Sequence, residues 1–429
     1  MGSDGMAFAL AEAASVEQAA DYNVAPFASP APRMRNLSSW DLFCRVVDNY
    51  GDIGVCWRLA RQLVQEHGHT VRLWVDDLRA FERLCPAVDT AAAAQRVSGV
   101  DIRRWSDDAG VAALLAADAH AAPHDVVVEA FACDIPEPML QRMADAARQG
   151  RAPIWINLEY LSAEDWVATH HAMQSPHPRL PLVKHFFFPG MARGTGGVLR
   201  EAQLGAQRAA FEASPTAHRT LWHRLGVDDL MQHAPDALRV SLFAYPNPAL
   251  PSLIAQWAAS ARPVICLVPE GLAAAQIAEQ LGATAPAAGA RWTQGPLSVA
   301  VVPFVPQEHY DALLWACDVN FVRGEDSFVR AQWALRPFVW HIYPQSDDAH
   351  LAKLDAFLAR YAPALPQAAA DALATFWHAW NAQPTSLDWP AFAAALAPLR
   401  DRAATWEHTL LCLGDLAANL VAFCEKQVK

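Results

Sequence analysis

DLFCRVVDNYGDIGVCWRLARQLVQE, which spans residues 41–66, changes from the pattern of a buried strand to that of an amphipathic helix. The apolar run at 42–47 has the length of a strand, and apolar residues recur at helical spacing over 53–64. The spacing of apolar residues changes from the strand pattern to the helix pattern at residues 49–51. In an open α/β sheet, ligands bind outside the carboxyl ends of the strands, where turn backbone and a helix N-terminus are exposed together. The stretch therefore predicts a strand–turn–helix unit with a candidate ligand site at its turn.

Two aspartates, Asp48 and Asp52, lie at this turn and have two interpretations. In the structural one, Asp52 is the N-cap of the helix, Asp48 is a solvated turn residue, and Gly51 and Gly54 serve only a tight turn and close packing. In the functional one, the carboxylates recognise a cationic or proton-donating substrate. The turn is neither a dinucleotide fingerprint nor a P-loop, because it lacks the G-x-G-x-x-G spacing and no lysine follows.

The composition is typical of a soluble globular protein with two domains. The 429 residues are 53% hydrophobic and 18% charged, and no apolar run reaches the length of a membrane span. A net charge of −12 argues against a general nucleic-acid binder, whose affinity depends on Lys and Arg. The eight cysteines form no C-x-x-C pair, which indicates neither a zinc site nor a disulfide framework. Since no signal peptide is evident either, a cytoplasmic location is expected.

Strand patterns alternate with helix patterns twice along the chain, which predicts two parallel sheets covered by helices. In the first alternation, strand ends are expected to bring Glu129, Asn157 and Glu159 to the same sheet edge as Asp48. The second alternation begins with a strand at 238–245. The predicted organisation is a disordered extension at 1–37, an N-terminal Rossmann-like domain at 38–225, a C-terminal Rossmann-like domain at 226–409, and a final helix at about 410–429 that packs back onto the first domain.

A second polar turn follows the strand predicted at 318–322. It reads RGEDS, from Arg323 to Ser327, and precedes a helix predicted at 328–335. A glycine turn at a helix N-terminus beside an arginine is suited to a pyrophosphate, because free N–H groups, the helix dipole and the guanidinium all favour an anion. The structural alternative is that Ser327 or Asp326 caps the helix and Arg323 pairs with Glu325 at the surface.

Further residues favour the anion-binding interpretation. Gln307, at a helix start after a strand, carries an amide able to read a pyrimidine edge, and Phe304 or Tyr310 is available to stack on the ring. Tyr343, which follows a strand predicted at 338–342, has a hydroxyl that could donate to the same phosphates. Together these residues predict a nucleotide-diphosphate site in the second domain.

With both turns in view, the chain resembles the inverting arginine rhamnosyltransferases that modify bacterial translation elongation factor P. The resemblance covers nearly everything from about Trp40 onward and rests on VVDNYGDIGVCWRLARQL, VVVEAFACDIP, WINLEYLSAEDWV, SLFAYPN, FVPQEHYDALLWACDVNFVRGEDSFVRAQWA and PFVWHIYPQ. It implies an α/β GT-B fold, in which two Rossmann-like domains face each other across a cleft. It also implies dTDP-β-L-rhamnose as donor in the C-terminal domain and an arginine of elongation factor P as acceptor against the N-terminal one. No metal, other cofactor, nucleic acid or membrane partner is expected.

The resemblance also assigns roles by motif. Asp52 resembles the general base, Asp48 its essential neighbour that binds or orients the acceptor, and Glu325 the essential glutamate of the donor site. The remaining donor-site positions are Arg323, Asp326, Ser327 and Tyr343 for the pyrophosphate, Gln307 for thymine, and Phe243, Tyr245, Phe304 and Tyr310 for the pocket lining. The alternatives are a GT-B transferase with another nucleotide sugar or acceptor, and a non-catalytic nucleotide-binding protein on the same fold.

Overall fold

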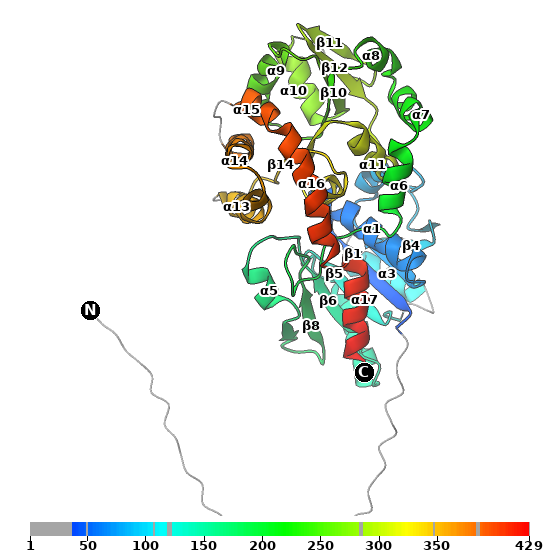
Figure 1. Cartoon of the computed structure of the whole chain (residues 1–429). Helices are drawn as coiled ribbons and strands as arrows, with labels where there is room; N and C mark the ends of the chain where they lie inside the picture. Colours follow the sequence, from blue (N-terminus) through cyan, green and yellow to red (C-terminus); the bar gives the residue numbers. More distant parts are fainter. Residues whose placement is uncertain are drawn as a thin grey trace, which may run out of the picture.

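A computed structural model describes residues 37–428, apart from 49, 106–107, 118–121, 283–285, 346–347 and 383–386. The predicted disorder of 1–37 therefore lies outside the described residues, except for Leu37. Two sheets organise the chain, and helices flank both of them (Figure 1). We call the eight-stranded sheet with its helices the N-terminal unit and the six-stranded sheet with its helices the C-terminal unit.

The sheet of the N-terminal unit has the strand order β3-β4-β2-β1-β5-β6-β8-β7. Its strands are parallel except at the two edges, where β3 pairs antiparallel with β4 and β7 with β8. The central position of β1 places its carboxyl end, and the turn that follows, at the middle of the sheet edge. The strands are β1 (Ser39–Cys44), β2 (Thr70–Val75), β3 (Ala94–Val97), β4 (Val100–Arg104), β5 (Val126–Ala130), β6 (Ile154–Leu158), β7 (Gln174–Pro176) and β8 (Val183–Phe187).

The sheet of the C-terminal unit has the order β11-β12-β10-β9-β13-β14. Only the β11–β12 pair is antiparallel. Here β9 and β13 are neighbours in the middle of the sheet, so the segments that follow them lie close together. The strands are β9 (Leu238–Leu242), β10 (Val264–Pro269), β11 (Arg291–Gln294), β12 (Leu297–Val302), β13 (Val319–Arg323) and β14 (Phe338–His341).

Helices connect the strands and join the two units. None of the helices in the described part of the chain has the length and apolar character that crossing a membrane requires. The helices are α1 (Gly51–Gln65), α2 (Leu78–Leu84), α3 (Asp108–Ala117), α4 (Glu137–Arg148), α5 (Trp166–His170), α6 (Leu204–Glu212), α7 (Pro215–Leu225), α8 (Asp228–His233), α9 (Leu250–Ala258), α10 (Leu272–Gln280), α11 (Gln307–Ala316), α12 (Asp326–Trp333), α13 (Ala349–Tyr361), the 3-10 helix η2 (Ala362–Ala364), α14 (Gln367–Asn381), α15 (Trp389–Ala394), α16 (Leu396–Leu411) and α17 (Leu416–Gln427).

The first predicted strand is shorter than the apolar pattern suggests. It ends at Cys44, and Val47 is 66% exposed. The backbone N–H of Val46 donates to Asp76 and that of Val47 to Asp52, so side chains rather than a neighbouring strand take these donors. Apolar character alone does not extend a strand when local carboxylates bind its amides.

The last helical stretch is broken where the sequence pattern predicts continuity. Gly414 adopts φ +77 between α16 and α17, and Asp415 caps α17 by accepting from the N–H groups of its first turn. Figure 1 shows α16 running from the C-terminal unit toward α17, which lies beside the N-terminal unit. There Phe423 of α17 packs edge-on against Phe187 of β8, with ring centroids 5.5 Å apart. The predicted domain boundaries stay predictions.

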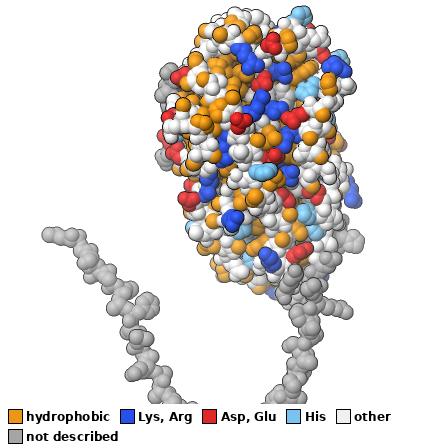
Figure 2. Space-filling view, in the orientation of Figure 1, with side chains coloured by type: hydrophobic (Ala, Val, Ile, Leu, Met, Phe, Trp, Pro, Cys, Tyr) orange, Lys and Arg blue, Asp and Glu red, His pale blue; other side chains and the backbone are white. Residues whose placement is uncertain are grey.

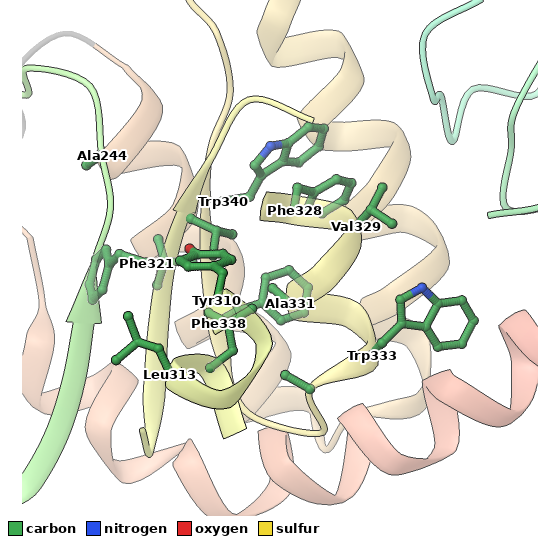
Figure 3. Packing of buried hydrophobic residues seen from close by; sticks show 14 of the residues in the cluster. Ala244, Tyr310, Leu313, Phe321, Phe328, Val329, Ala331, Trp333, Phe338 and Trp340 are labelled. Carbon is green, nitrogen blue, oxygen red and sulfur yellow. The ribbon is translucent and has the colours of Figure 1, made fainter. Parts of the chain in front are cut away.

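An aromatic core supports the turn between β13 and α12. Phe328 stacks on Trp340 with ring centroids 3.7 Å apart, and Figure 3 shows the two side chains together above α12. The indole N–H of Trp340 donates to the carbonyl oxygen of Gly324 at 2.8 Å. Buried packing and a buried hydrogen bond therefore hold the turn that carries the predicted donor-site residues.

A cleft lies between the two units. Asp48 and Asp52 line it from the N-terminal unit, and Gly324 and Glu325 from the C-terminal unit. On the face shown in Figure 2, Lys and Arg side chains alternate with Asp and Glu, so that this face presents neither sign of charge alone. Two mainly parallel, helix-covered sheets facing across a cleft form the α/β GT-B architecture that the sequence predicts.

Candidate active site

The cleft contains a cavity of about 580 Å³ between the two polar turns. It brings together the three carboxylates predicted to be essential, Asp48 and Asp52 after β1 and Glu325 after β13. Tyr343, which follows β14 and is 43% exposed, also lines it. Residues more than 270 positions apart in the chain thus meet at the carboxyl ends of two parallel sheets, where ligands of such folds bind.

Asp52 lies inside the first turn of α1, so its interpretation as an N-cap is wrong. Its side chain is 1% exposed and turns back toward the strand. Oδ2 accepts from the backbone N–H of Val47 at 2.7 Å and of Asp48 at 2.8 Å, and Oδ1 accepts from the Tyr160 hydroxyl at 2.9 Å. The carboxylate therefore has a fixed orientation at the cavity wall.

Asp48 is half-buried and bound to the opposite unit, so it is not a solvated turn residue. Its Oδ2 accepts from the hydroxyl of Tyr245, which follows β9, at 2.7 Å. Burial raises the pKa of Asp48 above its ordinary value, and nearby Asp52 adds to this, although the Tyr245 hydrogen bond and the Arg323 charge act in the opposite direction. Asp48 also borders the narrow pocket that contains Arg323.

Glu325 extends from the C-terminal unit to the backbone of the N-terminal unit. Its Oε1 accepts from the N–H of Leu161 at 2.8 Å. Burial raises the pKa of Glu325 to about 8, and the charges of Asp52 and Asp48 add to this, against the Leu161 hydrogen bond and Lys353. A carboxyl group with such a pKa is protonated at neutral pH and can donate a hydrogen bond.

Arg323 lies among aromatic rings. It is 8% exposed, and its guanidinium carbon lies 4.4 Å from the ring centroid of Phe243 and 4.6 Å from that of Tyr245. No carboxylate among the described residues forms an ion pair with it, so the proposed surface pair with Glu325 is wrong. A buried cation that faces a pocket without a carboxylate partner suits an anionic ligand.

Most predicted donor-site residues meet in a second pocket beside the large cavity. This pocket measures only about 40 Å³, far less than the roughly 300–1,000 Å³ of typical ligand sites. The buried hydroxyl of Tyr310 has no hydrogen-bond partner among the described residues. The pocket must widen before a nucleotide can enter. Its lining includes Phe243, Phe304, Gln307, Tyr310, Arg323, Asp326 and Ser327.

Gln307 connects the two units. Its Nε2 donates to the carbonyl oxygen of Gly54 in α1 at 2.8 Å and to Oδ2 of Asp326 at 2.9 Å. The Arg61 side chain donates to its Oε1 at 3.3 Å. The amide predicted to read thymine is therefore bound to the N-terminal helix in this structure, and it must exchange these partners to read a base.

Asp326 belongs to a buried ion-pair network between the units. Its carboxylate accepts from Arg58 of α1 at 3.0 Å and from Arg330 at 3.2 Å. Burial alone would raise the pKa of Asp326, but Arg330 and Arg58 outweigh burial and hold it below its ordinary value. Arg58 also binds Glu201 at 2.7 Å. The Asp326 side chain is thus bound to protein partners, and its backbone N–H, in the first turn of α12, is the group that remains for an anion.

Ser327 is likewise bound within its own turn. Its hydroxyl donates to the carbonyl oxygen of Arg323 and accepts from the N–H of Arg323 at 2.9 Å. No side-chain cap is present at the start of α12, so the interpretation of Ser327 or Asp326 as a helix cap is wrong. The hydroxyl stabilises the end of β13 and thereby the position of Arg323.

The other predicted strand-end residues have partners of their own. Glu129 is buried and binds Lys184 at 2.8 Å and the indole N–H of Trp155 at 3.1 Å. Asn157 donates to Glu159, whose pKa is raised by burial. Parallel strands do deliver these groups to one sheet edge, where hydrogen bonds and an ion pair bind them, except that the buried Oδ1 of Asn157 has no partner among the described residues.

The residues that line the cavity and that sequence reasoning missed include Tyr160, Leu161 and Lys353. Tyr160 and Leu161 lie two and three residues after the end of β6, and the same rule that selected Asp48 after β1 would have indicated them. Lys353 lies on α13, where no local pattern separates a cavity lysine from a surface lysine.

Comparisons with known proteins agree with this geometry. The family model described as "Elongation-Factor P (EF-P) rhamnosyltransferase EarP" matches residues 40–425. Two relatives named protein-arginine rhamnosyltransferase come from Pseudomonas aeruginosa, 47% identical over 90% of this chain and 99% of the relative, and from Pseudomonas putida, 48% identical over 90% and 98%.

A solved structure described as "Structural basis for EarP-mediated arginine glycosylation of translation elongation factor EF-P" superposes with a TM-score of 0.63. It is 36% identical and covers 90% of this chain and 98% of its own. The match of the family model over most of the chain and the high identity to full-length relatives lead to one conclusion: the chain belongs to the EarP family of glycosyltransferases, the elongation factor P rhamnosyltransferases.

Proposed function

We propose that this chain transfers L-rhamnose from dTDP-β-L-rhamnose to an arginine side chain of translation elongation factor P, in the cytoplasm and with inversion at the anomeric carbon. The names of the relatives supply the sugar, the arginine and the protein acceptor. One observation carries the chemistry. Carboxylates from both units line one cavity, and a buried arginine without a carboxylate partner among the described residues lies in the adjoining pocket.

The two aspartates suit a guanidinium acceptor. A guanidinium has a pKa above about 12 and a delocalised lone pair, so it is protonated and weakly nucleophilic in water. Asp48 and Asp52 bind it and align one nitrogen with the anomeric carbon. As the new C–N bond forms, that nitrogen loses a proton to Asp52. The fixed orientation of the Asp52 carboxylate serves this transfer.

The second turn suits the leaving group. When the bond between the anomeric carbon and the diphosphate oxygen breaks, its electron pair stays on the diphosphate. Arg323 and the N-terminus of α12 favour this negative charge. Protonated Glu325 donates a hydrogen bond from the cavity side. Acceptor and leaving group then lie in different units, on opposite sides of the sugar, and this placement supports inversion from a β donor to an α product.

Intact-mass measurement of elongation factor P after incubation with enzyme and dTDP-β-L-rhamnose tests the reaction. The wild-type enzyme is expected to add one deoxyhexose. Asp52→Asn is expected to bind dTDP normally by calorimetry and to lose transfer, whereas Asp145→Asn on the exposed surface of α4 leaves both unchanged. Wild-type rates in Asp52→Asn would exclude the base role.

The donor is tested separately. Titration with dTDP and with UDP is expected to show tighter binding of dTDP, because the pocket with Gln307 and its aromatic neighbours is proposed to read thymine. Equal affinity would favour a different nucleotide sugar. Binding of dTDP without release of any sugar from the donor would favour the non-catalytic alternative.

A further inference from the structure

Tyr160 and Leu161 contact the catalytic carboxylates of both units. The Tyr160 hydroxyl donates to Oδ1 of Asp52 at 2.9 Å, and the next residue, Leu161, donates its backbone N–H to Oε1 of Glu325 at 2.8 Å. Both residues line the large cavity. Two consecutive residues that follow β6 thus bind both the proposed base and the proposed donor-site glutamate, and so relate the positions of these two carboxyl groups.

The ring of Tyr160 is itself held in place by a neighbouring aromatic ring. Its ring stacks on Phe131, with centroids 4.3 Å apart and planes 13° apart. Phe131 has φ +58, a left-handed conformation that a bulky residue adopts only when its surroundings impose it. Its N–H donates to the carbonyl oxygen of Leu158 at 2.7 Å, which fixes the strained residue to the end of β6. Backbone strain of this kind clusters at functional sites. Here the strained residue is the one whose ring stacks on Tyr160.

The hydrogen bonds that the Asp52 carboxylate accepts leave one of its lone pairs free. A carboxylate has about four lone-pair sites, two on each oxygen. Two backbone N–H groups bind Oδ2, and Tyr160 binds Oδ1. The second lone pair of Oδ1 is therefore the one available for a proton from the acceptor.

We propose that Tyr160 is a positioning residue, whose hydroxyl fixes the carboxylate plane of Asp52 so that the open lone pair of Oδ1 meets the acceptor nitrogen. This inference rests on the proposed function. Tyr160 remains a donor throughout, because burial raises its pKa and the charges of Asp52 and Glu325 raise it further. The residue is 36% exposed and lines the cavity that the acceptor is proposed to enter.

Tyr160→Phe tests this role, because it keeps the ring on Phe131 and removes only the hydroxyl. The expected result is a fall in kcat of about 10- to 100-fold, the effect of losing one hydrogen bond to a charged group. The Kd of dTDP, measured by calorimetry, is expected to stay within about twofold, because Tyr160 does not line the nucleotide pocket. The melting temperature is expected to stay close to that of the wild type.

The split between kcat and KM gives a second readout that a general loss of structure would not reproduce. The hydroxyl orients the Asp52 carboxylate for proton transfer and not for substrate binding, so KM for elongation factor P is expected to stay within about twofold while kcat falls. Tyr361→Phe, a buried tyrosine against Trp406 and away from the cavity, is the matched control and is expected to leave kcat and KM unchanged.

The outcomes separate two failures. If wild-type enzyme adds no deoxyhexose to elongation factor P, the proposed function fails. If the wild type is active and Tyr160→Phe matches it in kcat, the positioning role is overturned while the function stands. A lower kcat together with a raised KM or weaker dTDP binding also overturns it, because the hydroxyl would then act on folding or substrate binding rather than through Asp52.

Discussion

The hydroxyl of Tyr245 donates to Oδ2 of Asp48 at 2.7 Å, and this hydrogen bond joins the segment after β9 to the turn after β1. The same tyrosine ring lies 4.6 Å from the guanidinium carbon of Arg323. One side chain thus touches both the proposed acceptor carboxylate and the proposed diphosphate-binding cation. The relative position of these two groups therefore depends on one shared side chain.

Tyr245→Phe removes the donor from this contact and leaves Asp48 partly buried without it. We expect kcat/KM for transfer to fall by about tenfold or more, because a hydrogen bond to a charged group contributes about 1.5–3 kcal/mol. Steady-state kinetics with Tyr361→Phe as the control measures the effect. An unchanged kcat/KM would show that the bond is incidental to the reaction.

Gly324→Ala is expected to block transfer. Gly324 has φ +58, and an added Cβ would overlap the Asp48 carboxylate and lie 2.8 Å from the Tyr245 hydroxyl oxygen. The new methyl group pushes the two units apart at the reacting centre, where a shift of about 1 Å costs about 100-fold in rate. Intact-mass time courses measure the loss.

Gly226→Ala is the matched control for backbone strain. Gly226 has φ +68, and no atom lies within 4 Å of an added Cβ. Both substitutions are expected to lower the free energy of unfolding by roughly 1–2 kcal/mol, the cost of a left-handed alanine. Only Gly324→Ala is expected to lose transfer activity. If both variants lost activity equally, backbone strain alone would explain the effect.

Arg58→Met is expected to destabilise the fold by about 3–5 kcal/mol, because it removes a buried cation that binds the buried carboxylate of Asp326 and the partly exposed carboxylate of Glu201. Denaturant unfolding measures this. Arg148→Met removes an exposed pair with Asp145 and is expected to change the free energy of unfolding by about 0–1 kcal/mol. A similar small effect at both positions would mean that the buried network contributes little.

Local patterns predicted much of this fold because they depend on neighbouring residues. The strand predicted at 318–322 and the helix after Asp52 follow from the hydrophobic period, and the cavity at the strand ends follows from parallel pairing. The edge strands β3 and β11 were missed, since they are exposed and lack an apolar run. A sheet edge is defined by its partner rather than by its own composition.

The contacts between the units could not be predicted in the same way. Gln307 binds Gly54 across 253 positions, and Arg58 binds Asp326 across 268. The family resemblance assigned Asp326 to the pyrophosphate, and in this structure its carboxylate is bound in an ion-pair network. A local motif shows where a helix starts but not which distant side chain meets its first turn.

Burial also gives the stability of the chain a specific pH dependence. The pKa of Glu325 is raised from 4.5 to about 8, so between these values the folded chain holds a proton that the unfolded chain has lost. Stability therefore falls as pH rises from 4.5 to about 8 and levels off above it. Relative to Glu325→Gln, which does not titrate, the wild type is expected to lose melting temperature across this window. Parallel curves for the two proteins would contradict a raised pKa.

The same titration is expected to control donor binding. Protonated Glu325 is neutral beside the proposed diphosphate site, whereas ionised Glu325 repels the diphosphate and must be protonated before binding. The Kd of dTDP is therefore expected to be constant below pH 8 and to rise by about tenfold per pH unit above it. Calorimetry between pH 6 and about 9.5 measures this, and Glu325→Gln is expected to flatten the curve while retaining the affinity of the neutral form. If the wild-type Kd stayed level across pH 8, the glutamate would not be protonated when the diphosphate binds, and hydrogen-bond donation to the leaving group would have to come from Arg323 and the α12 N-terminus alone.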